Sequence, residues 1–203
     1  MKPLVVGIAG GSASGKTTLT SALTEYLRED TPSHSVEVFP LDRYLYRGAP
    51  GGPRFKSPST GEDLPDNNHP NSADNTKLVA DLDQLCESPD APEIVILEGL
   101  MLLHVPEIRS RIALKLFIQL DGDLRAIRRL LRDMKGGRGS TDPEWIATYY
   151  RECAREGHNN YVEPSKRYAD LIIPGDAPTH RSAILVAGAI RSLLNETYIR
   201  NIS

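Results

Sequence analysis

The chain has 203 residues, with 24 lysines and arginines against 27 aspartates and glutamates, and a formal net charge of −3. This balance argues against nucleic-acid and membrane partners, and no run approaches the ~20 apolar residues that cross a bilayer. The only two cysteines, Cys86 and Cys153, lie far apart, which argues against a disulfide framework and favours a reducing cytoplasm.

An apolar strand is predicted over residues 4–9 and a helix over 16–29. Between them, residues 10–17 read GGSASGKT and fit the phosphate-loop pattern G-x-x-x-x-G-K-[ST]. A glycine-rich turn in this position directs backbone N–H groups and the positive end of the helix dipole at one point. The sequence therefore predicts a nucleoside triphosphate site, in which Lys16 reaches the phosphates and the Thr17 hydroxyl binds Mg²⁺. The predicted triphosphate-binding residues are Gly10, Gly11, Ser12, Ala13, Ser14, Gly15, Lys16, Thr17 and Thr18.

A second strand is predicted over residues 35–39, and Asp42 follows its end. In this position Asp42 is expected to face the γ-phosphate from the acceptor side. An aspartate carboxylate is ionised at neutral pH and can accept a hydroxyl proton during phosphoryl transfer. Asp42 is therefore the candidate catalytic base, and the alternative is an aspartate that merely precedes a loop.

Residues 43–72 are rich in glycine and proline and poor in apolar residues. They are predicted to form a long surface excursion without packed elements of its own, which borders the acceptor site. The alternative is a disordered linker. The excursion contains four basic residues, Arg43, Arg47, Arg54 and Lys56. They favour an anionic acceptor if their side chains point inward, and otherwise they are solvated.

The rest of the chain alternates apolar runs with helical patterns, which predicts a parallel sheet. Strands are expected at 93–97, 114–120 and 169–173, and helices at 75–87, 106–112, 123–135, 142–158 and 179–195. The predicted fold is α/β, of the P-loop NTPase type: three layers, a five-stranded parallel sheet flanked by helices, and a lid segment. One P-loop domain is expected over 1–203, with 123–158 as the lid helices.

Glu98 ends the strand at 93–97, where ligands bind in parallel sheets. It is a candidate to hold Mg²⁺ through a water molecule, and the alternative is a surface acid at a strand end. The sequence has no [NT]-K-x-D motif, which a GTPase normally needs to read its base.

The helix at 123–135 has a basic face and an apolar face. The basic face holds Arg125, Arg128, Arg129 and Arg132, and the apolar face Leu124, Ile127, Leu130, Leu131 and Met134. The apolar stripe is interpreted as core. The helix leads into a glycine-rich hinge at 135–140, so its arginines are predicted to act from a lid on the transferring phosphate, with Arg128 and Arg132 as catalytic candidates. The alternative is a solvated charged face.

The five histidines form no metal-binding pattern. His69 is a candidate substrate contact, and the others are interpreted as ordinary surface or loop residues.

Six segments taken together resemble the uridine kinases of the phosphoribulokinase/uridine kinase family, over residues 4–176. They are GIAGGSASGKTT at 7–18, DRY at 42–44, NHPNSA at 68–73, ILEGL at 96–100, RRLLRD at 128–133 and EPSKRYADLIIP at 163–174.

The resemblance implies an ATP-dependent kinase that phosphorylates the 5′-hydroxyl of a pyrimidine nucleoside. It implies that Asp42 is the base and that Lys16, Thr17 and Glu98 serve the triphosphate and Mg²⁺. It also implies that Arg132 contacts phosphates and that the loop containing Gly175 passes the adenine. The implied acceptor contacts are Asp42, Tyr44, Asn68, His69, Arg129 and Arg138.

The departures from the family lie on the acceptor side. The family's base-binding β-hairpin is missing between Cys86 and Glu93, Asn68 replaces an aspartate that holds the ribose, and Leu45 replaces a tyrosine. The excursion 43–72 is a candidate replacement for the hairpin. The acceptor therefore stays open between a nucleoside and a sugar, sugar phosphate, nicotinamide riboside or pantothenate-like compound. A non-catalytic nucleotide-binding regulator and assembly into a homo-oligomer also stay open.

Overall fold

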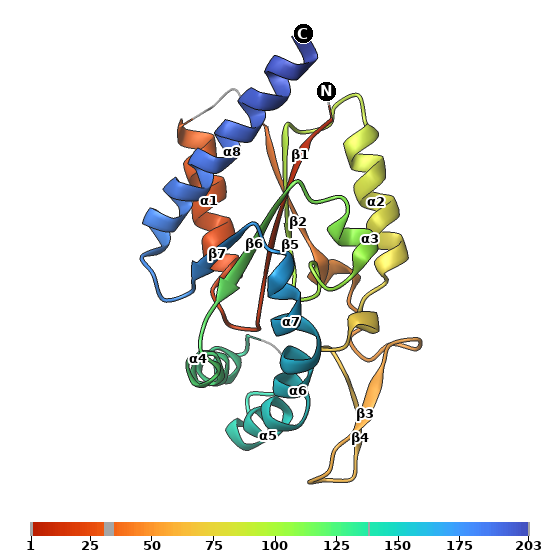
Figure 1. Ribbon diagram of the computed structural model, residues 1–203. Helices are drawn as coiled ribbons and strands as arrows, with labels where there is room; N and C mark the ends of the chain where they lie inside the picture. Colours follow the sequence, from red (N-terminus) through yellow and green to blue (C-terminus); the bar gives the residue numbers. More distant parts are fainter. Residues whose placement is uncertain (1, 31–34, 138, 203) are drawn as a thin grey trace.

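The computed structural model describes residues 2–30, 35–137 and 139–202. A five-stranded sheet runs through it in the order β2–β5–β1–β6–β7, with every neighbouring pair parallel (Figure 1). The strands are β1 (Leu4–Gly10), β2 (Val36–Pro40), β5 (Ile94–Glu98), β6 (Leu114–Gln119) and β7 (Leu171–Pro174). The predicted α/β fold with a five-stranded parallel sheet is confirmed.

Helices cover both faces of the sheet, which gives the three expected layers (Figure 1). Helices α1 (Lys16–Asp30) and α8 (Thr179–Ile202) lie on one face, and α2 (Asn75–Glu87) and α3 (Pro106–Arg109) on the other. Within the described ranges, none of the helices has the length and hydropathy that a bilayer crossing requires.

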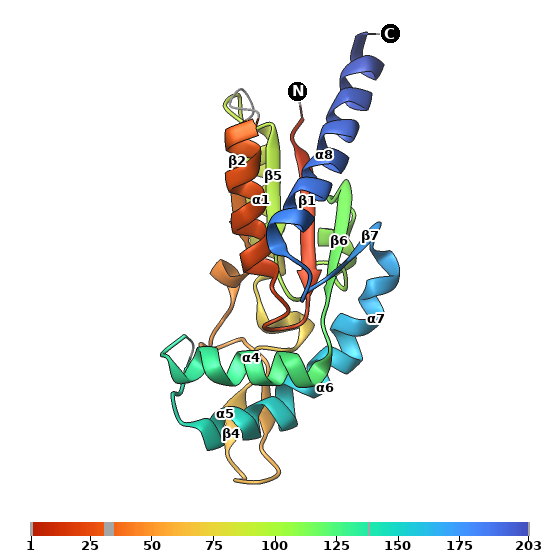
Figure 2. The ribbon, with the colours of Figure 1, turned by 90° about the vertical axis from the view of Figure 1, so that its left-hand side faces the viewer.

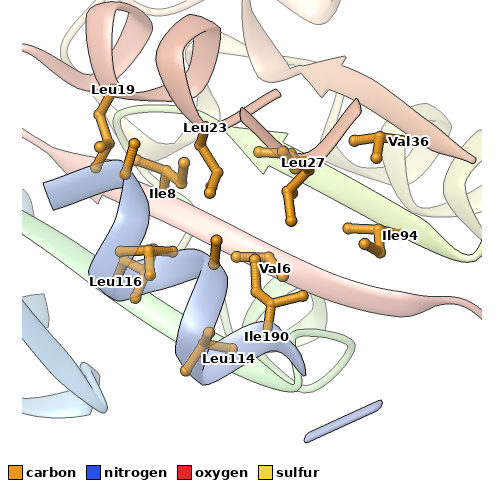
Figure 3. Packing of buried hydrophobic residues seen from close by; sticks show 14 of the residues in the cluster. Val6, Ile8, Leu19, Leu23, Leu27, Val36, Ile94, Leu114, Leu116 and Ile190 are labelled. Carbon is orange, nitrogen blue, oxygen red and sulfur yellow. The ribbon is translucent and has the colours of Figure 1, made fainter. Parts of the chain in front are cut away.

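The two sides of β1 pack into different clusters, because successive strand side chains point to opposite faces. Val6 and Ile8 pack with α1 and α8 (Figure 3), whereas Val5 and Ala9 pack with the α2 side. Both faces of this strand are therefore buried, which explains its continuous apolar sequence.

The strand register brings three strand ends together. Glu98, the last residue of β5, lies opposite Ile8 of β1 and opposite Pro40, the last residue of β2. The glycine-rich turn after β1, Asp42 after β2 and Glu98 after β5 therefore meet at the carboxyl edge of the sheet, where ligands bind in open α/β folds.

A second group of helices lies beyond this edge. Helix α4 (Gly122–Met134) crosses beneath the strands, with α5 (Pro143–Tyr149) below it (Figure 2). The chain stays helical from Pro143 to Tyr168, longer than the predicted 142–158. Its successive parts are η3 (Tyr150–Ala154), α6 (Arg155–Gly157), η4 (His158–Val162), α7 (Glu163–Ser165) and η5 (Lys166–Tyr168), of which η3 and η4 are π-helical and η5 is a 3₁₀ turn.

The apolar stripe of α4 is not core, and this part of the sequence interpretation was wrong. Ile127, Leu131 and Met134 are 54%, 55% and 45% exposed, whereas Arg125 and Asp133 of the same helix are buried. The helix lies across the strand ends instead of on a sheet face, and its basic side faces inward. The usual rule that the apolar side of a surface helix faces the core is reversed here.

The excursion 43–72 contains a packed element, contrary to the sequence prediction. Its strands β3 (Arg54–Lys56) and β4 (Asp63–Pro65) pair antiparallel as a short hairpin (Figure 1). Two isolated strands of this length are marginal in water. Hydrogen bonds from Ser57 to Glu152 and from Tyr149 to Pro65 fasten this hairpin to the helix at 143–162, the part of the helical stretch from α5 to η4. By contrast, residues 88–93, between α2 and β5, contain no strand.

Candidate functional site

A cavity of about 880 Å³ opens at the carboxyl edge of the sheet. It is lined by Lys16 and Thr17 at the start of α1, by Asp42 after β2, and by Glu98 at the end of β5. Helix α4 contributes Arg128, Arg129 and Arg132, and the turn after β7 contributes Gly175. The structure thus brings most of the sequence-predicted site residues around one space.

The phosphate loop has the backbone conformation that its glycines predict. Gly10 and Gly15 adopt φ values of +143° and +106°, which residues with a Cβ rarely adopt. A Cβ on Gly10 would also lie 2.5 Å from the carbonyl oxygen of Ile118 in β6. The loop is closed on itself by a hydrogen bond from the Lys16 Nζ to the Gly11 carbonyl oxygen, at 2.9 Å.

Thr17 and Glu98 meet across the cavity floor. The Thr17 hydroxyl donates a hydrogen bond to Glu98 Oε1 at 2.7 Å. A hydroxyl and a carboxylate are hard oxygen donors of the kind that Mg²⁺ accepts together with phosphate oxygens and water. The described residues contain no cluster of three or more His, Cys, Asp or Glu side chains suited to a metal. These two oxygens therefore fit a metal held mainly by a nucleotide, not one held by the protein alone.

The three cavity-lining arginines of α4 have different partners: Arg128 binds the turn after β7, and Arg129 and Arg132 bind Asp133. The exposed Arg128 donates from Nη1 to the Gly175 carbonyl oxygen at 2.9 Å. Arg132 pairs with the buried Asp133 at 2.8 Å. Arg129 lies within 3.4 Å of the same carboxylate, and its burial lowers the pKa of its guanidinium. The cavity thus has cationic groups along the side that carries α4.

Two of the predicted acceptor contacts, Tyr44 and His69, do not line the cavity. Tyr44 stacks on Phe39 and donates to Asp81 in α2 at 2.9 Å, and burial raises its pKa to about 12. His69 accepts a hydrogen bond from the backbone N–H of Asn71 and packs edge-on against Tyr161. Arg138 lies outside the described residues.

One wall of the cavity is made of the excursion and α5. Asn68 is 5% exposed, and its amide nitrogen lies 3.4 Å from the Tyr149 hydroxyl. Tyr149 in turn stacks on Trp145, with ring centroids 5.1 Å apart. All three residues line the cavity. The sequence interpretation gave Trp145 no role, although its spacing of four residues from Tyr149 in a helix predicts that the two rings meet.

Two residues lie behind the phosphate loop, where sequence reasoning did not place them: it assigned Arg125 to the basic face of the lid helix and gave His158 no role. Arg125 and His158 are both buried, and a Cβ on Gly11 would lie 2.8 Å from Arg125 Nη1 and 3.0 Å from His158 Nδ1. Burial and the Arg125 charge lower the pKa of His158 to about 4, although its contact with the Glu163 carboxylate acts in the opposite direction. A neutral imidazole and a buried guanidinium thus support the backbone of the loop. His158 is not the ordinary surface histidine that the sequence predicted.

The turn after β7 is packed directly on the phosphate loop. The Gly175 N–H donates to the Gln119 carbonyl oxygen at 2.7 Å, and a Cβ on Gly175 would lie 2.2 Å from the Ser14 carbonyl oxygen. Only glycine permits this approach of one backbone to another.

The Gly175 contact leads to a stability prediction. Gly175→Ala is expected to lower the free energy of unfolding by about 1–3 kcal/mol, because the new methyl group must displace loop backbone. The matched control is Gly188→Ala in α8, where a Cβ meets nothing within 4 Å. That change is expected to raise the free energy of unfolding by about 0.5–1 kcal/mol, since alanine is the better helix former. Urea unfolding of both variants measures the difference, and equal effects would contradict the close approach at Gly175.

A central parallel strand that ends in a glycine-rich turn, followed at once by a helix, defines a P-loop protein. A shikimate kinase from Acinetobacter baumannii, solved in complex with shikimate, aligns over 94% of both chains with a TM-score of 0.54 at 14% identity, a likeness of fold alone. The chain is 34% identical over 219 residues to a uridine kinase of Anoxybacillus flavithermus, covering 98% of each. It is 33% identical over 216 residues to a uridine kinase of Bacillus cereus, covering 96% of each. The model of the phosphoribulokinase/uridine kinase family matches residues 68–180, and the chain belongs to this family of kinases.

Proposed function

We propose that this protein is an ATP-dependent kinase that transfers the γ-phosphoryl group to a hydroxyl of a nucleoside-like acceptor. The observation that carries the proposal is that one cavity is lined by the phosphate loop, Glu98 and Asp42. Nucleotide binding alone does not require a carboxylate such as Asp42 beyond the terminal phosphate, whereas transfer to a hydroxyl does. We further propose that residues 1–203 form one kinase domain, with 43–72 on the acceptor side and 123–158 as its lid.

On the phosphate side, Lys16 and the backbone N–H groups of residues 10–18 bind the triphosphate. Arg128 and Arg132 neutralise charge on the transferring phosphoryl group from α4, because this reaction depends mainly on positioning and on charge stabilisation. Gly175 shapes the nucleotide site through its contact with the loop.

Mg²⁺ fits the oxygen donors of Thr17 and Glu98 (the latter through water) and would lower the negative charge of the β- and γ-phosphates. Asp42 accepts the proton of the acceptor hydroxyl as the new phosphate ester forms, and ADP leaves.

A nucleoside-like acceptor is supported by the aromatic wall and by the uridine kinases among the relatives. Trp145 is 37% exposed and lines the cavity, so its ring is available to a planar base. Asn68 and Arg129 complete this side as polar contacts.

Arg47 favours a second candidate, a kinase for an anionic acceptor such as a sugar phosphate. Of the four basic residues in the first half of the excursion, Arg47 is the one that lines the cavity, whereas Arg54 pairs with Asp63 on the hairpin. Arg47 also has a positive φ of +50° and donates to the Asp42 carbonyl oxygen at 3.2 Å. A guanidinium beside the candidate base suits a second phosphate or a carboxylate on the acceptor.

The test is ADP release from ATP and Mg²⁺ in the presence of single acceptors. The panel contains uridine, cytidine, nicotinamide riboside, ribose, ribulose 5-phosphate and pantothenate. Stimulation by a nucleoside supports the first candidate, and stimulation by ribulose 5-phosphate or pantothenate supports the second. ATP binding without stimulation by any of these compounds would favour a nucleotide-binding regulator.

A further inference from the structure

The turn of the β3–β4 hairpin is fastened to the helix at 143–162 through one carboxylate. The Ser57 hydroxyl donates to Glu152 Oε2 at 2.7 Å, and the Ser59 hydroxyl donates to Glu152 Oε1. Ser57 is 1% exposed, and the Glu152 side chain is 8% exposed. Both oxygens of this largely buried carboxylate thus bind the same turn. Hydrogen bonds to an ionised acceptor are stronger than those between neutral groups, so these two bonds hold the turn firmly against the helix.

Further contacts continue along the same side of the helix. The Tyr149 hydroxyl donates to the Pro65 carbonyl oxygen at 2.9 Å, and the Cys153 thiol donates to Asp66 Oδ1 at 3.1 Å. One turn later, a Cβ on Gly157 would lie 2.4 Å from the Asn68 carbonyl oxygen. Tyr149, Glu152, Cys153 and Gly157 all contact the segment 57–68. Residues 57–68 are therefore held along a single helix face.

This helix face supports the acceptor wall from behind. Pro65, Asn67 and Asn68 of the held segment line the cavity, as do Trp145 and Tyr149 of the helix. Glu152, Ser57 and Ser59 are not among the lining residues. Any effect of Glu152 on an acceptor must therefore pass through the position of the wall.

We propose that Glu152 is a positioning residue that sets acceptor affinity, because it holds the β3–β4 hairpin against the helix at 143–162. Through this contact, residues 57–68 and the helix form one preassembled wall. The kinetic part of the inference rests on the proposed kinase function, and the structural part does not.

The structural part is tested by amide hydrogen exchange of the protein without ligands. In Glu152→Ala, we expect the amides of Ser57, Gly61 and Asp66, which are hydrogen-bonded within the excursion, to exchange at least ~10-fold faster than in the wild type. The matched control is Glu156→Ala on the same helix, which removes an exposed carboxylate paired with Arg155. In this control, the exchange rates of the same amides are expected to change less than twofold. Glu152→Gln should recover most of the protection, because its amide oxygen and nitrogen still serve both serine hydroxyls. Unchanged exchange in Glu152→Ala would overturn the inference.

The kinetic part uses the most active acceptor of the panel above. Glu152→Ala is expected to raise the KM for this acceptor by about tenfold, because both serine hydroxyls lose their charged acceptor and the wall is no longer held in place. The KM for ATP is expected to stay within twofold. Ser57→Ala should raise the acceptor KM less, and the double variant should be no worse than Glu152→Ala alone. A role confined to stability would lower the melting temperature without separating the two KM values, and that outcome would overturn the positioning role. Because exchange needs no turnover, its result distinguishes failure of this inference from failure of the proposed kinase activity.

Discussion

Asp42→Asn is expected to lower kcat by about 10²- to 10⁴-fold and to leave ATP binding nearly unchanged. The amide has the size of the carboxylate but cannot accept the hydroxyl proton, and a positioned general base contributes a factor of this order. Asp42 lies in a 3₁₀ turn, η1 (Leu41–Tyr44), directly after β2, so the substitution leaves the strand pairing intact. Acceptor-stimulated ADP release measures kcat, and calorimetric titration with a non-hydrolysable ATP analogue measures binding.

Asp90→Asn is the matched control for this change. Asp90 is an exposed aspartate in the connection between α2 and β5, and it does not line the cavity. Its substitution is expected to leave kcat within twofold. If Asp42→Asn kept more than a tenth of the wild-type kcat, Asp42 would not be the base.

Lys16→Met is expected to lower kcat by about 10²- to 10³-fold and to weaken ATP binding as well. The Lys16 ammonium group lies in the phosphate loop, in a position to stabilise charge on the β- and γ-phosphates. Removing one such donor typically lowers kcat by a factor of this size. Methionine keeps the length of the apolar stem, so the loss reports the charge.

Lys77→Met in α2 separates this effect from a general loss of positive charge. Lys77 is exposed and pairs with Asp81 on its own helix at 2.9 Å, so its loss should change kcat less than twofold. Equal effects of the two substitutions on kcat would show that Lys16 has no special part in phosphoryl transfer.

Sequence reasoning predicted the sheet well because the signals there are local. The five strands are short apolar runs next to turn residues, and the loop at 10–17 has a backbone geometry that glycines impose. Parallel strands then bring Asp42 and Glu98 to the same edge without any further information. The phosphate half of the cavity was predictable for this reason.

Helix α4 and the wall formed by the excursion and α5 were less predictable because tertiary contacts decide them. The pattern of α4 is amphipathic, but it does not tell which side faces inward when the inward side borders a cavity lined by arginines. The hairpin at 54–65 has few apolar residues of its own and depends on a partner 95 positions further along the chain, the Glu152 that Ser57 binds. His158 looks ordinary in the sequence, and only the fold places it behind Gly11.

The most direct test is a crystal structure with a non-hydrolysable ATP analogue, Mg²⁺ and the acceptor that most stimulates ADP release. The account predicts the reacting hydroxyl within about 2.6–3.2 Å of the Asp42 carboxylate and facing the γ-phosphate, which is bound by Lys16. An acceptor whose hydroxyl lies against another side chain, or a γ-phosphate directed away from Asp42, would contradict it.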